Sequence, residues 1–112
     1  MMIEKTIRDY LSARLDCPVR LEEPETPPER YVVLEKTGSG KQNQICRAII
    51  AIQSYGKSLH EAASLNEAVK RLMDDATTLD AVSRSALNSD YNFTDPTTKR
   101  YRYQAVYDIT HY

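Results

Sequence analysis

The sequence predicts an α+β fold, with a mostly antiparallel sheet of four to five strands and two main helices packed against it. Two stretches carry apolar residues at helical spacing, and two pairs of β-forming runs are joined by polar turns. Helices layered on such a sheet bury both kinds of apolar face, and the predicted order is α-β-β-β-α-β-β. With 112 residues, 41% hydrophobic and 28% charged, we expect one globular domain over residues 1–112.

The N-terminal part combines a helix, a short strand and a loop. Apolar residues recur from Ile3 to Leu15 at helical spacing, and Cys17-Pro18 ends this helix because a residue before proline resists helical geometry. A short extended piece follows at residues 19–21. Residues 22–28 are acidic and proline-rich, so we expect a stiff loop that cannot join a central sheet.

The first hairpin is predicted over residues 31–55. Residues 31–36 are rich in β-formers, residues 37–44 form a polar turn, and residues 45–55 form the second strand. Apolar residues occupy both faces of this second strand. We therefore expect a central strand that is covered on both sides.

A helix and a second hairpin complete the predicted fold. Ser58 and Glu61 form a capping box at the start of a helix that runs to about Asp75 or Ala76. Residues 82–93 are predicted to be a strand, and residues 95–99 a turn. In the last strand, residues 101–112, aromatic and apolar residues alternate with largely polar ones, which gives the strand one apolar face.

The charge balance limits the classes of partner. A net charge of −1, from 15 basic and 16 acidic residues, argues against a chain whose main task is to neutralise phosphates. No secretory signal is apparent, and no apolar run approaches the roughly 18 residues that a membrane span needs. We therefore expect a cytosolic chain with no membrane partner. Its two thiols are expected to be small hydrophobes, Cys46 inside a strand and Cys17 nearer the surface.

The apparent chemical motifs are incomplete. Gly38-Ser39-Gly40-Lys41 lacks the first glycine of a phosphate-binding loop, has Gln42 after the lysine, and precedes a strand where that motif needs a helix. His60 and His111 have no carboxylate or thiol at ligand spacing that would close a metal site. The sequence therefore predicts no metal, no cofactor, no catalytic residues and no enzymatic activity.

Tyrosine usage is the most unusual feature of the composition. The chain has eight tyrosines, one phenylalanine and no tryptophan, and five of the tyrosines lie in the last 22 residues. They are expected either to cover a sheet face beneath a helix or to form a protein interface, where tyrosine and arginine are favoured. Arg100 and Arg102 lie beside them and favour the second alternative.

Four segments resemble small tail-component proteins of long-tailed bacteriophages and prophages of low-GC Gram-positive bacteria. The two C-terminal segments, Leu87–Asp95 and Tyr101–Tyr112, carry most of the resemblance, and Glu35–Gly40 and Ser58–Ala63 fit the same group. The order of helices and hairpins also resembles the tail-terminator fold. The resemblance covers essentially the whole chain.

The resemblance implies a structural subunit of the virion tail that assembles in the host cytoplasm. Tail terminators form a hexameric ring that caps the head-proximal end of the tail tube and joins it to the head. The implied partners are further copies of the chain, the major tail tube protein, the head-tail connector protein and DNA passing through the ring. We expect the 37–44 loop and the 95–102 turn to contact them. The candidate assembly residues are Lys41, Gln42, Lys99, Arg100, Tyr101, Arg102 and Tyr103.

Two alternatives remain open at this point. The first is a head-tail connector, or stopper, which also forms rings but acts on the head side of the joint. The second is a monomeric regulatory module that binds a small ligand. Gene order, with a major tail protein encoded immediately downstream, would distinguish a terminator from a connector. A stable monomer that neither forms rings at high concentration nor caps tail tubes would favour the ligand-binding module.

Overall fold

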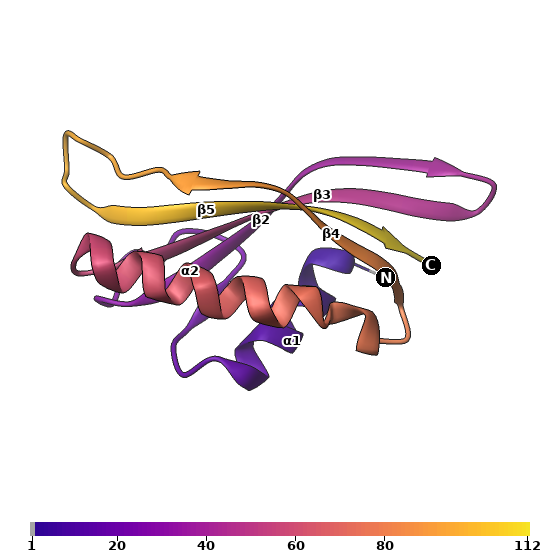
Figure 1. Cartoon of the computed structure of the whole chain (residues 1–112), viewed down its shortest axis with the longest axis horizontal. Helices are drawn as coiled ribbons and strands as arrows, with labels where there is room; N and C mark the ends of the chain where they lie inside the picture. The colour runs from indigo at the N-terminus through magenta and orange to yellow at the C-terminus, as the bar shows by residue number, and fades with distance from the viewer. Residues whose placement is uncertain (1) are drawn as a thin grey trace.

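The computed structural model describes residues 2–112 and confirms the predicted fold class. Two helices pack on one face of a five-stranded sheet with the strand order β1-β2-β3-β5-β4 (Figure 1). β1 is parallel to β2, and the other neighbouring strands are antiparallel. The elements are α1 (Ile3–Arg14), β1 (Val19–Arg20), β2 (Tyr31–Gln42), β3 (Ile45–Gly56), α2 (Leu59–Asp74), the short 3₁₀ helix η1 (Ala76–Thr78), β4 (Val82–Asn92) and β5 (Tyr101–His111).

The end of α1 and the start of α2 lie where the local sequence predicts them. α1 stops where Leu15 turns extended, just before the Cys17-Pro18 pair. At the start of α2, the Ser58 hydroxyl accepts a hydrogen bond from the backbone N–H of Glu61 at 3.1 Å, so the serine half of the predicted capping box is confirmed. A hydrogen bond of 2.6 Å from the Tyr10 hydroxyl to the Leu72 carbonyl links the two helices.

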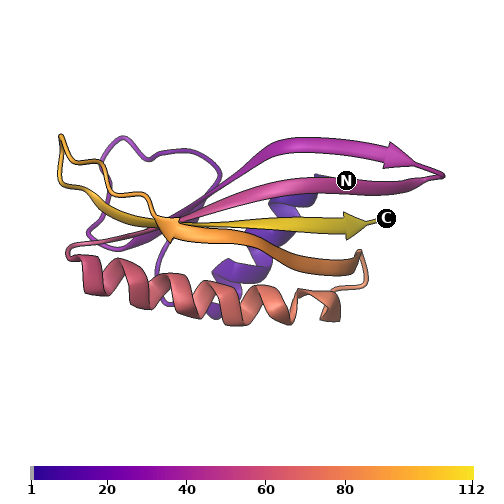
Figure 2. The same ribbon diagram turned by 45° about the horizontal axis from the view of Figure 1, so that its top comes forward.

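The main core lies between the helices and the inner face of the sheet. Figure 2 shows α2 running along this face. The buried residues of α2 face the alternate residues of β3 and β5 that point toward the helices, as the predicted alternation in β5 requires. The largest fully buried side chains on these elements are Ile50, Ile52, Leu65, Met73, Tyr107 and Ile109.

The predicted polar turn over residues 37–44 is wrong in extent. β2 continues to Gln42, and only Asn43 and Gln44, with φ angles of 51° and 66°, form the turn. A two-residue turn with both φ angles positive is type I′, whose twist matches that of the strands it joins. The polar residues after Lys36 therefore belong to a solvent-facing strand rather than to a loop, and the hairpin extends beyond the helices as an arm (Figure 2).

The prediction that β3 is covered on both faces is only half correct. Its inner face is buried, as Ile50 and Ile52 show. On the outer face Tyr55 is buried, but Ile45 and Ile49 are 45% and 41% exposed. The outer face is thus covered at the Tyr55 end, where the Glu23 carboxylate bonds the hydroxyls of Tyr31 and Tyr55, and bare at the other end.

The two edge strands are irregular, whereas the two inner strands that they flank pair without interruption. The register shifts between Lys36 and Gly38 in β2, and twice in β4, between Val82 and Arg84 and between Leu87 and Ser89. β1 pairs with only two residues of β2, so most of β2 forms one edge of the sheet, and β4 forms the other.

Candidate assembly surface

The seven residues predicted for assembly form two separate groups. Lys41 and Gln42 lie at the tip of the β2–β3 arm, opposite the start of β3. Lys99 and Arg100 lie at the turn between β4 and β5, whereas residues 101–103 are the first three of β5. Tyr101 pairs with Gly56 at the end of β3. Because β3 spans the sheet between them, the two groups occupy opposite ends of a molecule 44 Å long (Figure 1).

At the β4–β5 end, arginines and aromatic rings pack into a cluster. We call Tyr31, Tyr55, Phe93, Arg100 and Arg102 the arginine–tyrosine cluster. The two tyrosine rings stack with centroids 4.4 Å apart and are both buried. The Arg100 guanidinium lies 5.0 Å from the centroid of Tyr55, and that of Arg102 lies 4.5 Å from the centroid of Phe93.

The polar groups of this cluster are bonded within the chain. Arg102 donates to the Tyr55 hydroxyl at 2.9 Å and to the Phe93 carbonyl at 2.7 Å. Arg100 forms an ion pair of 2.9 Å with Glu23, whose carboxylate also accepts a bond of 2.6 Å from the Tyr31 hydroxyl. Burial raises the pKa of Tyr55, against the opposing effect of the Arg102 guanidinium.

The cluster therefore holds the acidic loop on the sheet. Arg100 and Arg102 are only partly exposed, and each is engaged by other residues of its own chain. Lys99 is exposed, and with a φ angle of 54° it is the last residue of the turn, directly before Arg100. Of the residues predicted at this end, Lys99 is the one whose charge is most available to a partner.

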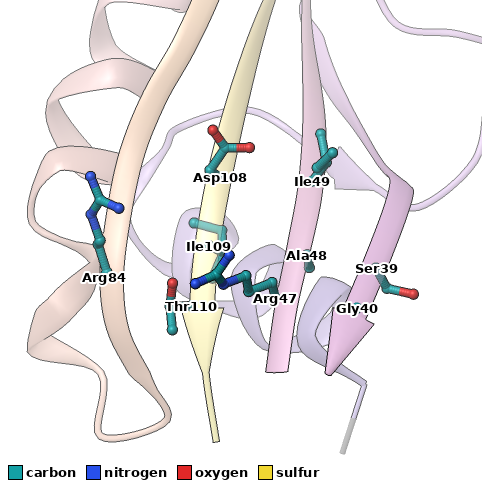
Figure 3. Close-up of a pocket in the computed structure, with 9 residues that line it drawn as sticks. All are labelled: Ser39, Gly40, Arg47, Ala48, Ile49, Arg84, Asp108, Ile109 and Thr110. Carbon is teal, nitrogen blue, oxygen red and sulfur yellow. The ribbon is translucent and has the colours of Figure 1, made fainter. Parts of the chain in front are cut away.

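A second surface, which the sequence did not predict, lies on the bare half of the outer face. Arg47 on β3 and Arg84 on β4 are both cross-strand neighbours of Thr110 on β5, so the three form one row across the sheet. Figure 3 shows Arg47 lying across β5 beside Thr110, with Arg84 on the far side of that strand. They line a shallow hollow of about 470 Å³, which we call the arginine groove.

The cysteines and histidines do not gather into a site in the described residues. Cys17 and Cys46 are both partly buried, so Cys46 is less enclosed and Cys17 more enclosed than predicted. Burial raises the pKa of the Cys17 thiol. Across residues 2–112, no group of three or more His, Cys, Asp or Glu side chains is placed to hold a metal ion. No helix in the same range has the length and apolar character to cross a membrane.

Comparison with known proteins adds no identification. No protein-family model matches the chain, and no curated protein matches it in sequence. Its functional assignment therefore depends on the surfaces described above.

Proposed function

We propose that this chain is a non-enzymatic structural subunit that assembles with copies of itself into a ring, in the manner of a phage tail terminator. The proposed ring caps the head-proximal end of the tail tube and joins it to the head connector. The resemblance of Tyr101–Tyr112 and the other segments to phage tail components supplies the tail context.

The observation that carries the proposal is the separation of two unlike patches along the molecule. The arm tip is a polar hairpin turn, and the opposite end combines Lys99 with the arginine–tyrosine cluster. A closed ring with rotational symmetry needs a heterologous interface, in which each subunit presents two different surfaces to its neighbours. A 44 Å subunit with distinct ends meets that requirement.

The first experiment tests ring formation and tube capping directly. The purified chain is examined by native mass spectrometry, and electron microscopy follows after mixing with tubes of a phage major tail protein. Rings seated on one end of tubes are the expected result. A chain that stays monomeric at high concentration and leaves the tubes uncapped would refute the proposal. Rings that bind isolated head connectors but not tubes would indicate the stopper role instead.

A pair of substitutions tests the two ends. Lys41→Glu with Lys99→Glu reverses one exposed charge at each end, and we expect capping to be lost while the fold is retained. Arg102→Glu is less suitable, because Arg102 also holds Tyr55 and the Phe93 carbonyl. Lys5→Glu with Arg71→Glu is the matched control, because these residues lie exposed on the helices and the change in net charge is the same. Equal capping by both double variants would mean that these two lysines take no part.

A further inference from the structure

The arginine groove carries positive charge that the chain itself does not neutralise. Within residues 2–112, neither Arg47 nor Arg84 forms an ion pair, and both are exposed. The nearest carboxylate on β5 is that of Asp108, two residues before Thr110. It accepts a hydrogen bond from the Asn88 side chain at 3.2 Å. Two guanidiniums flanking a threonine hydroxyl are suited to binding a carboxylate-rich segment.

The entrance to the groove is open on the side of β2. Gly40 is the cross-strand neighbour of Arg47, and a Cβ added there would meet no atom within 4 Å. The row Gly40, Arg47, Thr110, Arg84 thus ends without a side chain at the edge of the sheet. An extended chain can approach the guanidiniums from this edge.

The acidic loop at the opposite end carries the complementary charge. Residues 22–29 contain four glutamates, of which Glu22, Glu25 and Glu29 are exposed and form no ion pair within the described chain. Three prolines restrict the backbone of this segment, so less conformational entropy is lost when it binds. It is an exposed, stiff, negatively charged strip.

The chain also shows how this loop binds an arginine on the same sheet face. At its own end, Glu23 pairs with Arg100 and accepts hydrogen bonds from Tyr31 and Tyr55 on the outer face. The loop cannot reach the arginine groove of its own chain while held there. Arg47 and Tyr55 are eight residues apart on β3, a span of about 26 Å at the rise of an extended strand.

We propose that the arginine groove of one copy receives the acidic loop, residues 22–29, of a second copy of the chain. This inference rests on the proposed function, because it names the contact that joins neighbouring subunits. Arg47 and Arg84 bind the exposed glutamates, and the bare half of one sheet is covered by the loop of the next subunit. The two surfaces lie at opposite ends of the chain, so the contact is head-to-tail and can repeat around a ring.

A charge-swap experiment tests the pairing. The groove variant carries Arg47→Glu and Arg84→Glu, and the loop variant carries Glu22→Arg and Glu25→Arg; Glu23 is left intact because it holds the loop. Each variant alone places like charges in contact, and we expect its self-association to weaken at least tenfold. An equimolar mixture restores opposite charges at every contact, so association should return with the two variants alternating. Native mass spectrometry and sedimentation measure this, with Lys5→Glu and Arg71→Glu as the control that matches the groove variant in net charge.

The outcomes separate this inference from the proposed function. If the wild type self-associates and either variant alone does so equally well, or the mixture fails to recover, the groove-to-loop contact is wrong while ring formation stands. If the wild type associates only on tube ends, the same comparison is made by counting capped tubes. If the wild type neither associates nor caps tubes, the proposed function fails and this inference with it.

Discussion

Several tyrosine hydroxyls are used to join the layers of the molecule. Tyr10 donates to the carbonyl of Leu72, and Tyr107, which is fully buried, donates to that of Lys70 at 3.4 Å. Tyr55 bonds to Glu23 and Arg102. For the tyrosines of the last 22 residues, the sequence allowed either a sheet face covered by a helix or an interface, and for Tyr107 the covered face is correct. A count cannot distinguish the two, because tyrosine suits any site with one apolar and one polar end.

The buried tyrosines predict a stability that falls in alkali. Burial is the main cause that raises the pKa of Tyr10, Tyr55 and Tyr107 in the folded state. A raised pKa means that the folded chain resists losing these protons. These protonated tyrosines contribute fully to the free energy of unfolding below about pH 10, the pKa of tyrosine in the unfolded chain. The contribution is lost as the pH rises through their higher pKa values in the folded chain.

Spectrophotometric titration of tyrosinate checks this expectation. We expect these three hydroxyls to ionise late, together with the loss of tertiary structure by near-ultraviolet circular dichroism. Tyr107→Phe should remove one late-ionising group. Ionisation of all eight tyrosines in one step, with the fold intact, would contradict the prediction.

At the scale of elements, the sequence was most informative where periodicity and capping agree. The spacing from Ile3 and the serine at residue 58 predicted both helices closely, and the alternation in residues 101–112 predicted β5. The arm was missed because Gly38-Ser39-Gly40 has the composition of a turn. Its strand geometry is set by pairing with β3 and by the tight turn at Asn43, and neither is visible in local propensity.

The arginine groove could not have been predicted by the same means. Arg47 and Arg84 are 37 residues apart in the chain. They lie in one row across the sheet only because β5 pairs with both β3 and β4, so that each arginine is a cross-strand neighbour of Thr110. One local signal was present: Arg47 interrupts an otherwise apolar run, on the face opposite Ala48 and Ile50. A charge at that position indicates that the outer face there meets solvent or a partner.

The close contact between the end of β3 and the start of α2 gives a prediction for Gly56, with Gly40 as its control. A Cβ at Gly56 would lie 2.6 Å from the backbone nitrogen of Ala62 in the first turn of α2, so Gly56→Ala forces strand and helix apart. We expect this substitution to cost about 1 to 3 kcal/mol of stability, measured by urea denaturation. Gly40→Ala is the control, because its Cβ meets open space and its φ is not positive. It should leave stability unchanged or raise it by up to about 1 kcal/mol.

The turn of the arm gives a second prediction at this scale. Gln44 adopts a φ angle of 66°, which L-residues other than glycine and asparagine rarely take. Gln44→Gly creates the Asn-Gly pair that a type I′ turn favours. We therefore expect the free energy of unfolding, measured by thermal denaturation, to rise by about 1 kcal/mol. Gln42→Gly places the glycine in the last residue of β2, where it still pairs with β3, and should reduce the free energy of unfolding by about 0.5 to 1 kcal/mol. Destabilisation by both would contradict the turn geometry.

At the scale of the whole molecule, opposite charges at opposite ends predict an assembly that responds to salt. The acidic loop and the arginine groove are both exposed, so ions screen the contact between them. We expect association of the wild type to weaken roughly tenfold between low salt and about 1 M NaCl, where charges are screened beyond about 3 Å. Sedimentation at several salt concentrations measures the change. The groove variant, which has lost the attraction, should show no such decline; a salt-independent wild type would contradict this prediction.

The irregular edges of the sheet affect how readily separate copies of the chain aggregate with one another. Regular, flat edge strands invite open-ended stacking into fibres, and bulges twist an edge away from that geometry. All three register shifts fall on β2 and β4, the strands that carry the free edges. Separate copies of the chain can therefore accumulate to high concentration with less risk of amyloid-like aggregation. In the ring proposed above, growth would then be left to the surfaces at the two ends, and addition would stop once the ring had closed.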